Sequence, residues 1–136
     1  MRLTINTDGG ARGNPGPAAI GIVIKNSSGE LIYAHGEYIG KTTNNQAEYR
    51  ALVHAIKKAL ELNGTEIHCF LDSELLVRQL NYQYKVKDQG LAPLFLEVVN
   101  LASRFKKISY SHVPRAQNSA ADALLNEALD EALHKH

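Results

Sequence analysis

Hydrophobic and polar residues alternate along the first residues of the chain. In Leu3–Asp8, the residues Leu3, Ile5 and Thr7 share one side of the pattern, and the residues between them share the other. Strict alternation of this kind predicts a β-strand with one buried face. The strand ends on a carboxylate, and the next segment, Gly9–Pro17, contains four glycines and two prolines. Such a segment predicts an irregular loop rather than a helix or a strand.

The strand pattern returns after this loop. Ala18–Lys25 is again apolar and β-branched, which leads the chain back into a sheet. Within this part, Ile20–Lys25 and Leu31–Ile39 are predicted as two strands, joined by the turn-forming segment Asn26–Gly29. Together with the first strand they predict an antiparallel meander.

A helical pattern follows the meander. Thr43–Gln46 carries the polar residues that precede helices, and the helix is expected to reach about Leu62 and to stop at Asn63-Gly64. Glu48 lies four residues before Leu52, so it is in phase with the buried side of this helix and not with its solvated side. The buried side is predicted to include Leu52, Ala55, Ile56, Ala59 and Leu60.

The second half of the chain alternates between strands and helices. The predicted elements are a strand over Glu66–Leu71, a short helix over Ser73–Leu80, a loop over Asn81–Gly90, a helix from Pro93, a strand over Ile108–Val113 and a helix over Ser119–Leu133. The last two helices are predicted to bury Leu94, Val98, Leu101 and Phe105, and Ala121, Leu125, Ala128 and Ala132. This order predicts an α/β fold, in which three antiparallel strands and then two parallel strands form one mixed sheet with helices on both faces.

Length and composition are those of an ordinary globular protein. The 136 residues, 44% hydrophobic and 21% charged, predict a single domain over residues 1–136. The net charge of +1 gives no overall signal of nucleic-acid binding, so any basic surface must be local. The one cysteine, Cys69, excludes an internal disulfide and is expected in the core. Without an apolar leader or a long apolar span, we expect a cytoplasmic protein with no membrane association, and residues 134–136 are expected to fray.

Four acidic residues occupy equivalent places in this pattern. Asp8 and Asp72 end strands, whereas Glu48 and Asp122 lie in the first turns of helices. In a parallel arrangement, the ends of strands and the beginnings of helices meet at one edge of the sheet, where ligands bind. The four carboxylates are therefore expected to converge. Taken singly, each acid also fits a local role. Asp8 and Asp72 could be turn residues. Glu48 could form a capping box with Asn45, and Asp122 could form one with Ser119.

Four converging carboxylates have a definite chemistry. Like charges a few ångströms apart repel each other, so the cluster needs cations to remain ionised. Carboxylate oxygens without histidine or cysteine nearby suit Mg²⁺ or Mn²⁺ and not zinc. Two such ions, roughly 4 Å apart, can activate a water molecule and stabilise the leaving oxygen of a phosphodiester.

The chain resembles the ribonuclease H family, type 1 branch (ribonuclease HI), over nearly its whole length. The resemblance implies the ribonuclease H-like fold and an endonuclease that cuts the RNA strand of an RNA–DNA hybrid, leaving a 3′-hydroxyl and a 5′-phosphate. All four acids are present in the order and with the spacing of the family. The matching segments are Thr7–Gly10, Gly13–Gly16, Thr43–Glu48, Asp72-Ser73 and Asn118–Asp122.

The resemblance also implies catalytic roles. Asp8 and Asp72 would be the central ligands of two Mg²⁺ ions, with Mn²⁺ as a substitute. Glu48 would hold one ion near the attacking water, and Asp122 would complete the shell of the other. His112 lies ten residues before Asp122, where bacterial members carry a histidine that assists proton transfer or product release. A solvent-exposed residue at a loop edge is the alternative for His112, because the following residues, to Gln117, include a proline and no glycine.

Substrate contacts follow from the same resemblance. The 2′-hydroxyl distinguishes RNA from DNA at a given site, and backbone amides and small polar side chains can read it. Lys41 and Thr43 fall where the family grips a DNA phosphate, and Arg115 is a candidate for attraction to the backbone. The long basic protrusion of the best-known bacterial form is absent, so binding is predicted to be weaker and more sensitive to salt. The residues expected on the RNA strand are Gly9, Gly10, Asn14, Asn44, Asn45, Ser73 and Glu74, the last in place of a common glutamine.

Other functions stay open at this point. A hybrid-binding module without cleavage would share the fold, although the complete set of acids argues against it. A different nuclease on the same scaffold, such as a junction resolvase or a reverse-transcriptase domain, would differ in substrate. A nucleotide-binding enzyme is disfavoured because neither G-x-x-x-x-G-K-[ST] nor G-x-G-x-x-G occurs. No protein partner is implied, and a monomer is expected.

Overall fold

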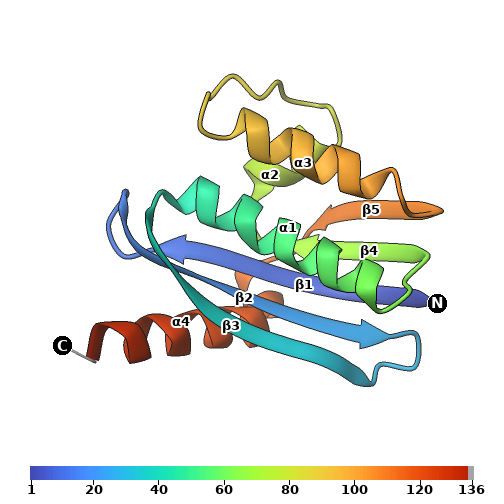
Figure 1. Ribbon diagram of the computed structural model, residues 1–136, viewed down its shortest axis with the longest axis horizontal. Helices are drawn as coiled ribbons and strands as arrows, with labels where there is room; N and C mark the ends of the chain where they lie inside the picture. The colour runs from blue at the N-terminus through green and yellow to red at the C-terminus, as the bar shows by residue number, and fades with distance from the viewer. Residues whose placement is uncertain (135–136) are drawn as a thin grey trace.

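The computed structural model describes residues 1–134 as a five-stranded sheet with helices on both faces (Figure 1). Of residues 134–136, which were expected to fray, His134 is the last residue of a helix, and residues 135 and 136 lie outside the described range. Among residues 1–134, no helix is long and apolar enough to cross a membrane. The elements are β1 (Arg2–Ala11), β2 (Gly16–Asn26), β3 (Leu31–Thr42), α1 (Asn44–Glu61), β4 (Glu66–Leu71), α2 (Glu74–Leu80), α3 (Ala92–Ala102), β5 (Lys107–His112), the 3₁₀ turn η1 (Arg115–Asn118) and α4 (Ser119–His134).

The strand order is β3-β2-β1-β4-β5. β1 pairs antiparallel with β2, and β2 pairs antiparallel with β3. On the other side, β1 pairs parallel with β4, and β4 pairs parallel with β5. The predicted α/β class and the mixed sheet are confirmed. This topology places β1 in the centre of the sheet, where both of its neighbours fix its position.

The two faces of the sheet are covered differently (Figure 1). α1, α2 and α3 lie on one side, and α4 lies alone across β2 and β3 on the other. The main core is on the α1 side, where Leu3 and Ile5 of β1 meet Leu52 and Ile56 of α1, all fully buried. The smaller core under α4 consists of Ala19, Leu125 and Leu129. α4 packs directly on the sheet backbone, because a Cβ on Gly21 would overlap the carbonyl of Ala121.

The limits of α1 agree closely with the prediction. The Thr43 hydroxyl accepts a hydrogen bond from the backbone N–H of Gln46 at 3.2 Å and so caps the helix. The helix stops before Asn63, whose φ of 62° is left-handed, and the Gly64 N–H then donates to the Ala59 carbonyl at 2.9 Å. Four of the five residues predicted on the buried side are fully buried, and Leu60 is half-buried.

The predicted loop over Gly9–Pro17 is too long. Gly9, Gly10 and Ala11 belong to β1 and pair with Ile20, Ala19 and Ala18 of β2, and β2 already begins at Gly16. The turn itself is confined to residues 12–15, where the Arg12 N–H donates to the Pro17 carbonyl at 2.8 Å and the Asn14–Pro15 bond is cis. The glycines therefore serve close packing within a strand and not only turn formation.

Smaller differences concern the last helices and strand. α3 ends at Ala102, so Phe105 lies beyond it, although it is buried as expected. β5 begins at Lys107 and ends at His112, one residue earlier than predicted at each end. In α4, Leu129 is buried, whereas Ala128 and Ala132 are only half-buried. Leu129 follows Leu125 by four residues, so these two larger side chains define the face that meets the sheet.

Candidate active site

The four predicted acids come together at one edge of the sheet. One carboxylate oxygen each from Asp8, Glu48 and Asp72 lies within 4.8 Å of the others. Asp122 lines the same cleft, which has a volume of about 520 Å³. The parallel pairing of β1 with β4 explains this arrangement, because Thr7 is in register with Leu71 and each is followed directly by an aspartate.

A glycine brings Glu48 to Asp8. The backbone of Gly9 lies directly against that of Ala47, and a Cβ on Gly9 would overlap the Ala47 carbonyl group. The first turns of α1 therefore rest on β1, and the Gly9 N–H donates a hydrogen bond to the Glu48 carboxylate. Thr43 is the residue that caps α1, so the alternative of a capping box between Asn45 and Glu48 is wrong.

A buried asparagine places the fourth acid. The side-chain amide of Asn118, which is 1% exposed, donates to the Thr7 carbonyl at 2.8 Å and accepts from Asn6 Nδ2 at 3.1 Å. These bonds attach η1, and thus the start of α4, to β1 next to Asp8. Asp122 lies in the first turn of α4 and pairs with Arg115, with Nη2 and Oδ1 3.3 Å apart. Sequence reasoning assigned no role to Asn118, and its only signal was its place in the Asn118–Asp122 segment.

Burial and mutual repulsion shift the pKa values of the two most enclosed acids. The pKa of Asp8 is raised to about 7, mainly by burial and secondly by the charge of Asp72. The pKa of Glu48 is raised well above its ordinary value, again mainly by burial and secondly by the charges of Asp8 and Asp72. The cluster therefore holds its negative charge at a cost in free energy.

The donor set fits divalent cations. All the ligand atoms in the cluster are carboxylate oxygens, which Mg²⁺ and similar hard cations prefer. Within residues 1–134, Glu48 Oε2 is buried without a hydrogen-bond partner, so an oxygen lone pair remains available. A bound cation would satisfy this atom and offset the repulsion between the carboxylates. Asp8, Glu48, Asp72 and Asp122 are thus the residues that could hold such an ion.

The predicted substrate contacts fall into two groups. Six of the ten line the cleft together with the acids, namely Gly9, Gly10, Asn44, Asn45, Ser73 and Arg115. The other four lie outside its wall. Lys41 is exposed near the end of β3, and Thr43 caps α1. The Glu74 carboxylate pairs with Arg78 at 2.8 Å, on the exposed side of α2.

Asn14 and Asn44 connect the β1–β2 turn to the start of α1. The Asn44 N–H donates to Asn14 Oδ1 at 3.0 Å, and Asn44 Oδ1 accepts from the Ala11 N–H at 2.8 Å. The asparagines therefore hold the turn and the helix end together at the rim of the cleft. Asn14 acts through this connection, although it does not itself line the cleft.

His112 lies at the same edge of the sheet but outside the cleft. It is the last residue of β5, it is exposed, and it is in register with Leu71, the residue before Asp72. His112 is not among the described residues that line the cleft. The segment that follows forms the short turn η1. The structure thus brings His112 to the neighbouring strand without bringing it against the acids.

Comparison with known proteins identifies related sequences. The family model described as "Reverse transcriptase-like" matches residues 6–128. Ribonuclease HI of Halobacterium salinarum is 43% identical over 125 residues, which cover 92% of this chain and 63% of that protein. A bifunctional protein of Mycobacterium tuberculosis is 43% identical over 133 residues, and this chain spans only 36% of its length.

Solved structures show the same likeness. The crystal structure of ribonuclease H1 from Halobacterium salinarum superimposes with a TM-score of 0.94 at 41% identity, covering 96% of this chain and 99% of that one. The LC11 ribonuclease H1, solved in complex with an RNA/DNA hybrid, superimposes with a TM-score of 0.91 at 43% identity, again covering 96% and 99% of the two chains.

Proposed function

The chain belongs to the ribonuclease H family, type 1 branch, and we propose that it is an endonuclease that hydrolyses the RNA strand of RNA–DNA hybrids. The observation that carries this proposal is the convergence of Asp8, Glu48 and Asp72 within 4.8 Å at the wall of an open cleft that Asp122 also lines. We further propose that residues 1–136 act as one ribonuclease H domain, as a monomer in the cytoplasm.

The acids would hold two Mg²⁺ ions, with Mn²⁺ as a substitute. When bound, such ions supply an activated water and charge stabilisation for the leaving 3′-oxygen, so that the products carry a 3′-hydroxyl and a 5′-phosphate. Asp8 and Asp72 lie side by side where the pairing of β1 with β4 ends, and they would be the shared ligands. Glu48 would act on the side of the attacking water, and Asp122 on the opposite side.

The residues around the acids would recognise the hybrid. Gly9, Gly10, Asn44 and Asn45 line the cleft, where their backbone amides and polar side chains would bond to 2′-hydroxyls of the RNA strand. Ser73 lies beside Asp72 on the same wall. Asn14 and Glu74 would support this side from outside the cleft. Lys41 and Thr43 would contact a phosphate of the DNA strand, and Arg115 would attract the backbone.

His112 would assist proton transfer or product release. Its position at the end of β5, in register with Leu71, supports a role beside Asp72. Because its side chain is exposed and outside the cleft wall, we expect it to aid turnover without being essential. His112→Ala should then slow turnover but leave cleavage detectable.

Cleavage of an end-labelled RNA strand paired with DNA tests the proposal. In Mg²⁺, the wild-type protein should cut the RNA of the hybrid and leave duplex RNA and duplex DNA intact, whereas Asp72→Asn should be inactive. Glu61→Gln is the control, because Glu61 is an exposed carboxylate that pairs with Lys58 at the end of α1 away from the cleft. Binding of the hybrid without cleavage in Mg²⁺ or Mn²⁺ would refute the proposed endonuclease activity and indicate a binding module instead.

A further inference from the structure

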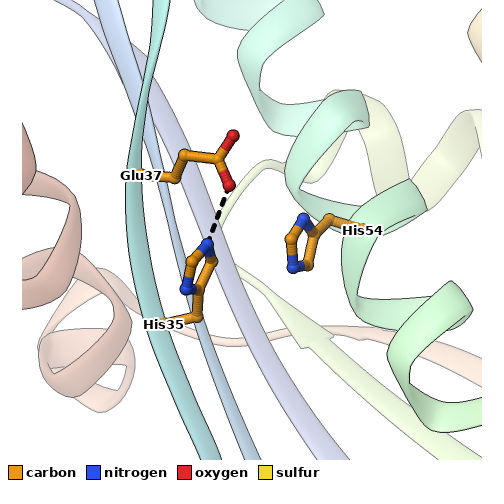
Figure 2. Close-up of side chains that lie close together, drawn as sticks. All are labelled: His35, Glu37 and His54. Carbon is orange, nitrogen blue, oxygen red and sulfur yellow. Dashed lines mark hydrogen bonds and ion pairs between the residues drawn. The ribbon is translucent and has the colours of Figure 1, made fainter. Parts of the chain in front are cut away.

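A second cluster of metal-ligating side chains lies two strands away from β1. His35 and Glu37 project from β3 toward α1, and His54 of α1 faces them (Figure 2). One ligand atom from each of the three residues lies within 4.8 Å of the other two. The closest pair is His35 Nε2 and Glu37 Oε1, at 2.8 Å. The proposed nuclease function uses none of these residues.

Strand periodicity places this cluster on the side facing α1. Residues two apart in a strand share a face, so Tyr33, His35 and Glu37 lie in a row along β3. The Tyr33 ring packs against the main core, and its hydroxyl lies 3.0 Å from His54 Nε2. The His35 and His54 rings are stacked, with centroids 4.8 Å apart and planes 14° apart. The row on β3 thus meets α1 through its polar side chains.

The surroundings of the cluster leave room for a bound cation. His54 is half-buried, and the neutral form of its imidazole can donate a lone pair to a metal ion. The neighbouring lysines are each paired with an acid: Lys57 with Glu97 at 3.5 Å, and Lys58 with Glu61 at 3.3 Å. Their charges are therefore partly balanced, and Glu37 directs its carboxylate to the histidine pair.

We propose that His35, Glu37 and His54 form a binding site for a divalent transition metal of the zinc class. Two imidazole nitrogens and one carboxylate oxygen are a known zinc donor set, in which water takes the fourth position. Zinc lies about 2.0–2.2 Å from such ligands. The three ligand atoms lie within 4.8 Å of one another, so rotation of the side chains can bring them to such an ion.

One ring must turn for the ion to bind. A metal ion lies in the plane of each imidazole that binds it, whereas the two rings are now nearly parallel. Rotation about the Cβ–Cγ bond brings a nitrogen of one ring toward the other, and the cluster is open enough to allow it. The His35 side chain is 32% exposed and that of Glu37 48% exposed.

The two metal sites would differ in what they accept. The acidic cluster offers only oxygen atoms and suits hard cations such as Mg²⁺, whereas imidazole nitrogen favours zinc and its neighbours in the transition series. An ion at the second site would connect β3, at the edge of the sheet, to α1. Because the unfolded chain does not hold the three ligands together, binding would stabilise the fold.

Zinc binding to the metal-free Asp8→Asn/Asp72→Asn protein tests this site apart from the acidic one. We expect one Zn²⁺ per chain by calorimetry and a higher melting temperature. At zinc 100-fold above its dissociation constant, the ratio of folded to unfolded protein should rise about 100-fold. Co²⁺ should give the strong visible absorption of a four-coordinate site with nitrogen ligands, which a six-coordinate oxygen site does not give.

Matched variants identify the ligands. In the same background, His35→Gln and His54→Gln should lose Zn²⁺ binding and the Co²⁺ absorption, and Glu37→Gln should weaken both. His68→Gln is the control, because His68 of β4 forms a hydrogen bond with Ser109 of β5, on the other side of the sheet's central strand from the cluster. Urea unfolding without metal shows whether each variant is folded. Because the Glu37 side chain is exposed, Glu37→Gln is the variant expected to disturb folding least. The absence of zinc binding, or binding that survives both histidine variants, would overturn the proposal.

Discussion

The side-chain amide of Asn118 donates a 2.8 Å hydrogen bond to the backbone carbonyl of Thr7, the residue before Asp8. The two residues are 111 positions apart in the sequence, and the bond is buried. It attaches the beginning of α4 to the central strand, so the position of Asp122 relative to Asp8 depends on it. The geometry of the acidic cluster therefore rests on a neutral residue that contacts neither the proposed ions nor the substrate.

Asn118→Ala should lower both stability and activity. The substitution leaves the buried Thr7 carbonyl without this donor, which typically costs about 1–3 kcal/mol. With α4 less firmly held, Asp122 should be misplaced, so kcat should fall more than KM rises. Urea unfolding and hybrid cleavage measure the two effects. Gln117→Ala, a change at the exposed neighbouring residue, is the control, and equal behaviour of the two variants would contradict the assigned role.

Much of the acidic site was predictable because its placement follows from local pattern and strand order. Asp8 follows Thr7, the last residue of β1 that pairs with β4, and Asp72 directly follows β4, so parallel pairing of the two strands is sufficient to bring the two aspartates together. The phase of Glu48 with Leu52 correctly indicated that it is buried. These inferences need only periodicity and the topology of an α/β sheet.

Tertiary contacts account for what the pattern did not predict. Glycines predict a turn locally, but pairing with β2 and the approach of Ala47 keep Gly9 within a strand. Likewise, nothing in the sequence relates His54 to His35, because the rotation of α1 relative to β3 is set by packing of the whole core. The bond from Asn118 to Thr7 is equally long-range.

The metal-free protein should lose stability as the pH rises from about 4 to 7. The pKa of Asp8 is 3.8 ordinarily and about 7 in the fold. An acid whose pKa is raised by folding stabilises the folded state fully below its unfolded pKa, and this stabilisation is lost as the pH rises through its folded pKa. Between the two pKa values, one such acid lowers the free energy of unfolding by about 1.4 kcal/mol per pH unit. Urea unfolding in a chelator, from pH 4 to 8, measures it.

Asp8→Asn isolates this contribution from those of the other carboxylates. The variant should gain stability relative to the wild type as the pH rises, because it removes the buried charge next to Asp72 and Glu48. Added Mg²⁺ should narrow the difference by stabilising the wild type alone. A stability difference that does not change between pH 4 and pH 8 would show that Asp8 is not destabilised by ionisation.

Gly9→Ala should disrupt the contact between β1 and α1. The added methyl group would overlap the Ala47 backbone, which cannot move without displacing the helix, and overpacking of this kind typically costs about 1–3 kcal/mol. Gly10→Ala is the matched control, because its methyl group would lie 3.6 Å from Leu125 Cδ1, an ordinary contact. Thermal unfolding should separate the two variants. If Gly9→Ala were as stable as Gly10→Ala, the close approach would be refuted.

Arg115→Gln should weaken hybrid binding with little effect on stability. Arg115 lines the cleft, but its side chain is 78% exposed, and an exposed ion pair such as that with Asp122 contributes about 0–1 kcal/mol. Loss of one phosphate contact reduces the slope of log K against log salt by about 0.9. Because the chain lacks a long basic protrusion, each remaining cation should carry a larger share of the binding. KM should therefore rise more than kcat falls.

The control for Arg115 is Lys106→Gln. Lys106 is exposed just before β5, and because β4 and β5 run parallel, it lies at the opposite end of these strands from Asp72. Its substitution removes the same charge from the protein but should leave the salt slope unchanged. A titration of hybrid binding from low to high salt compares both variants with the wild type. An equal change in the two slopes would mean that overall charge, and not a contact at the cleft, sets the attraction.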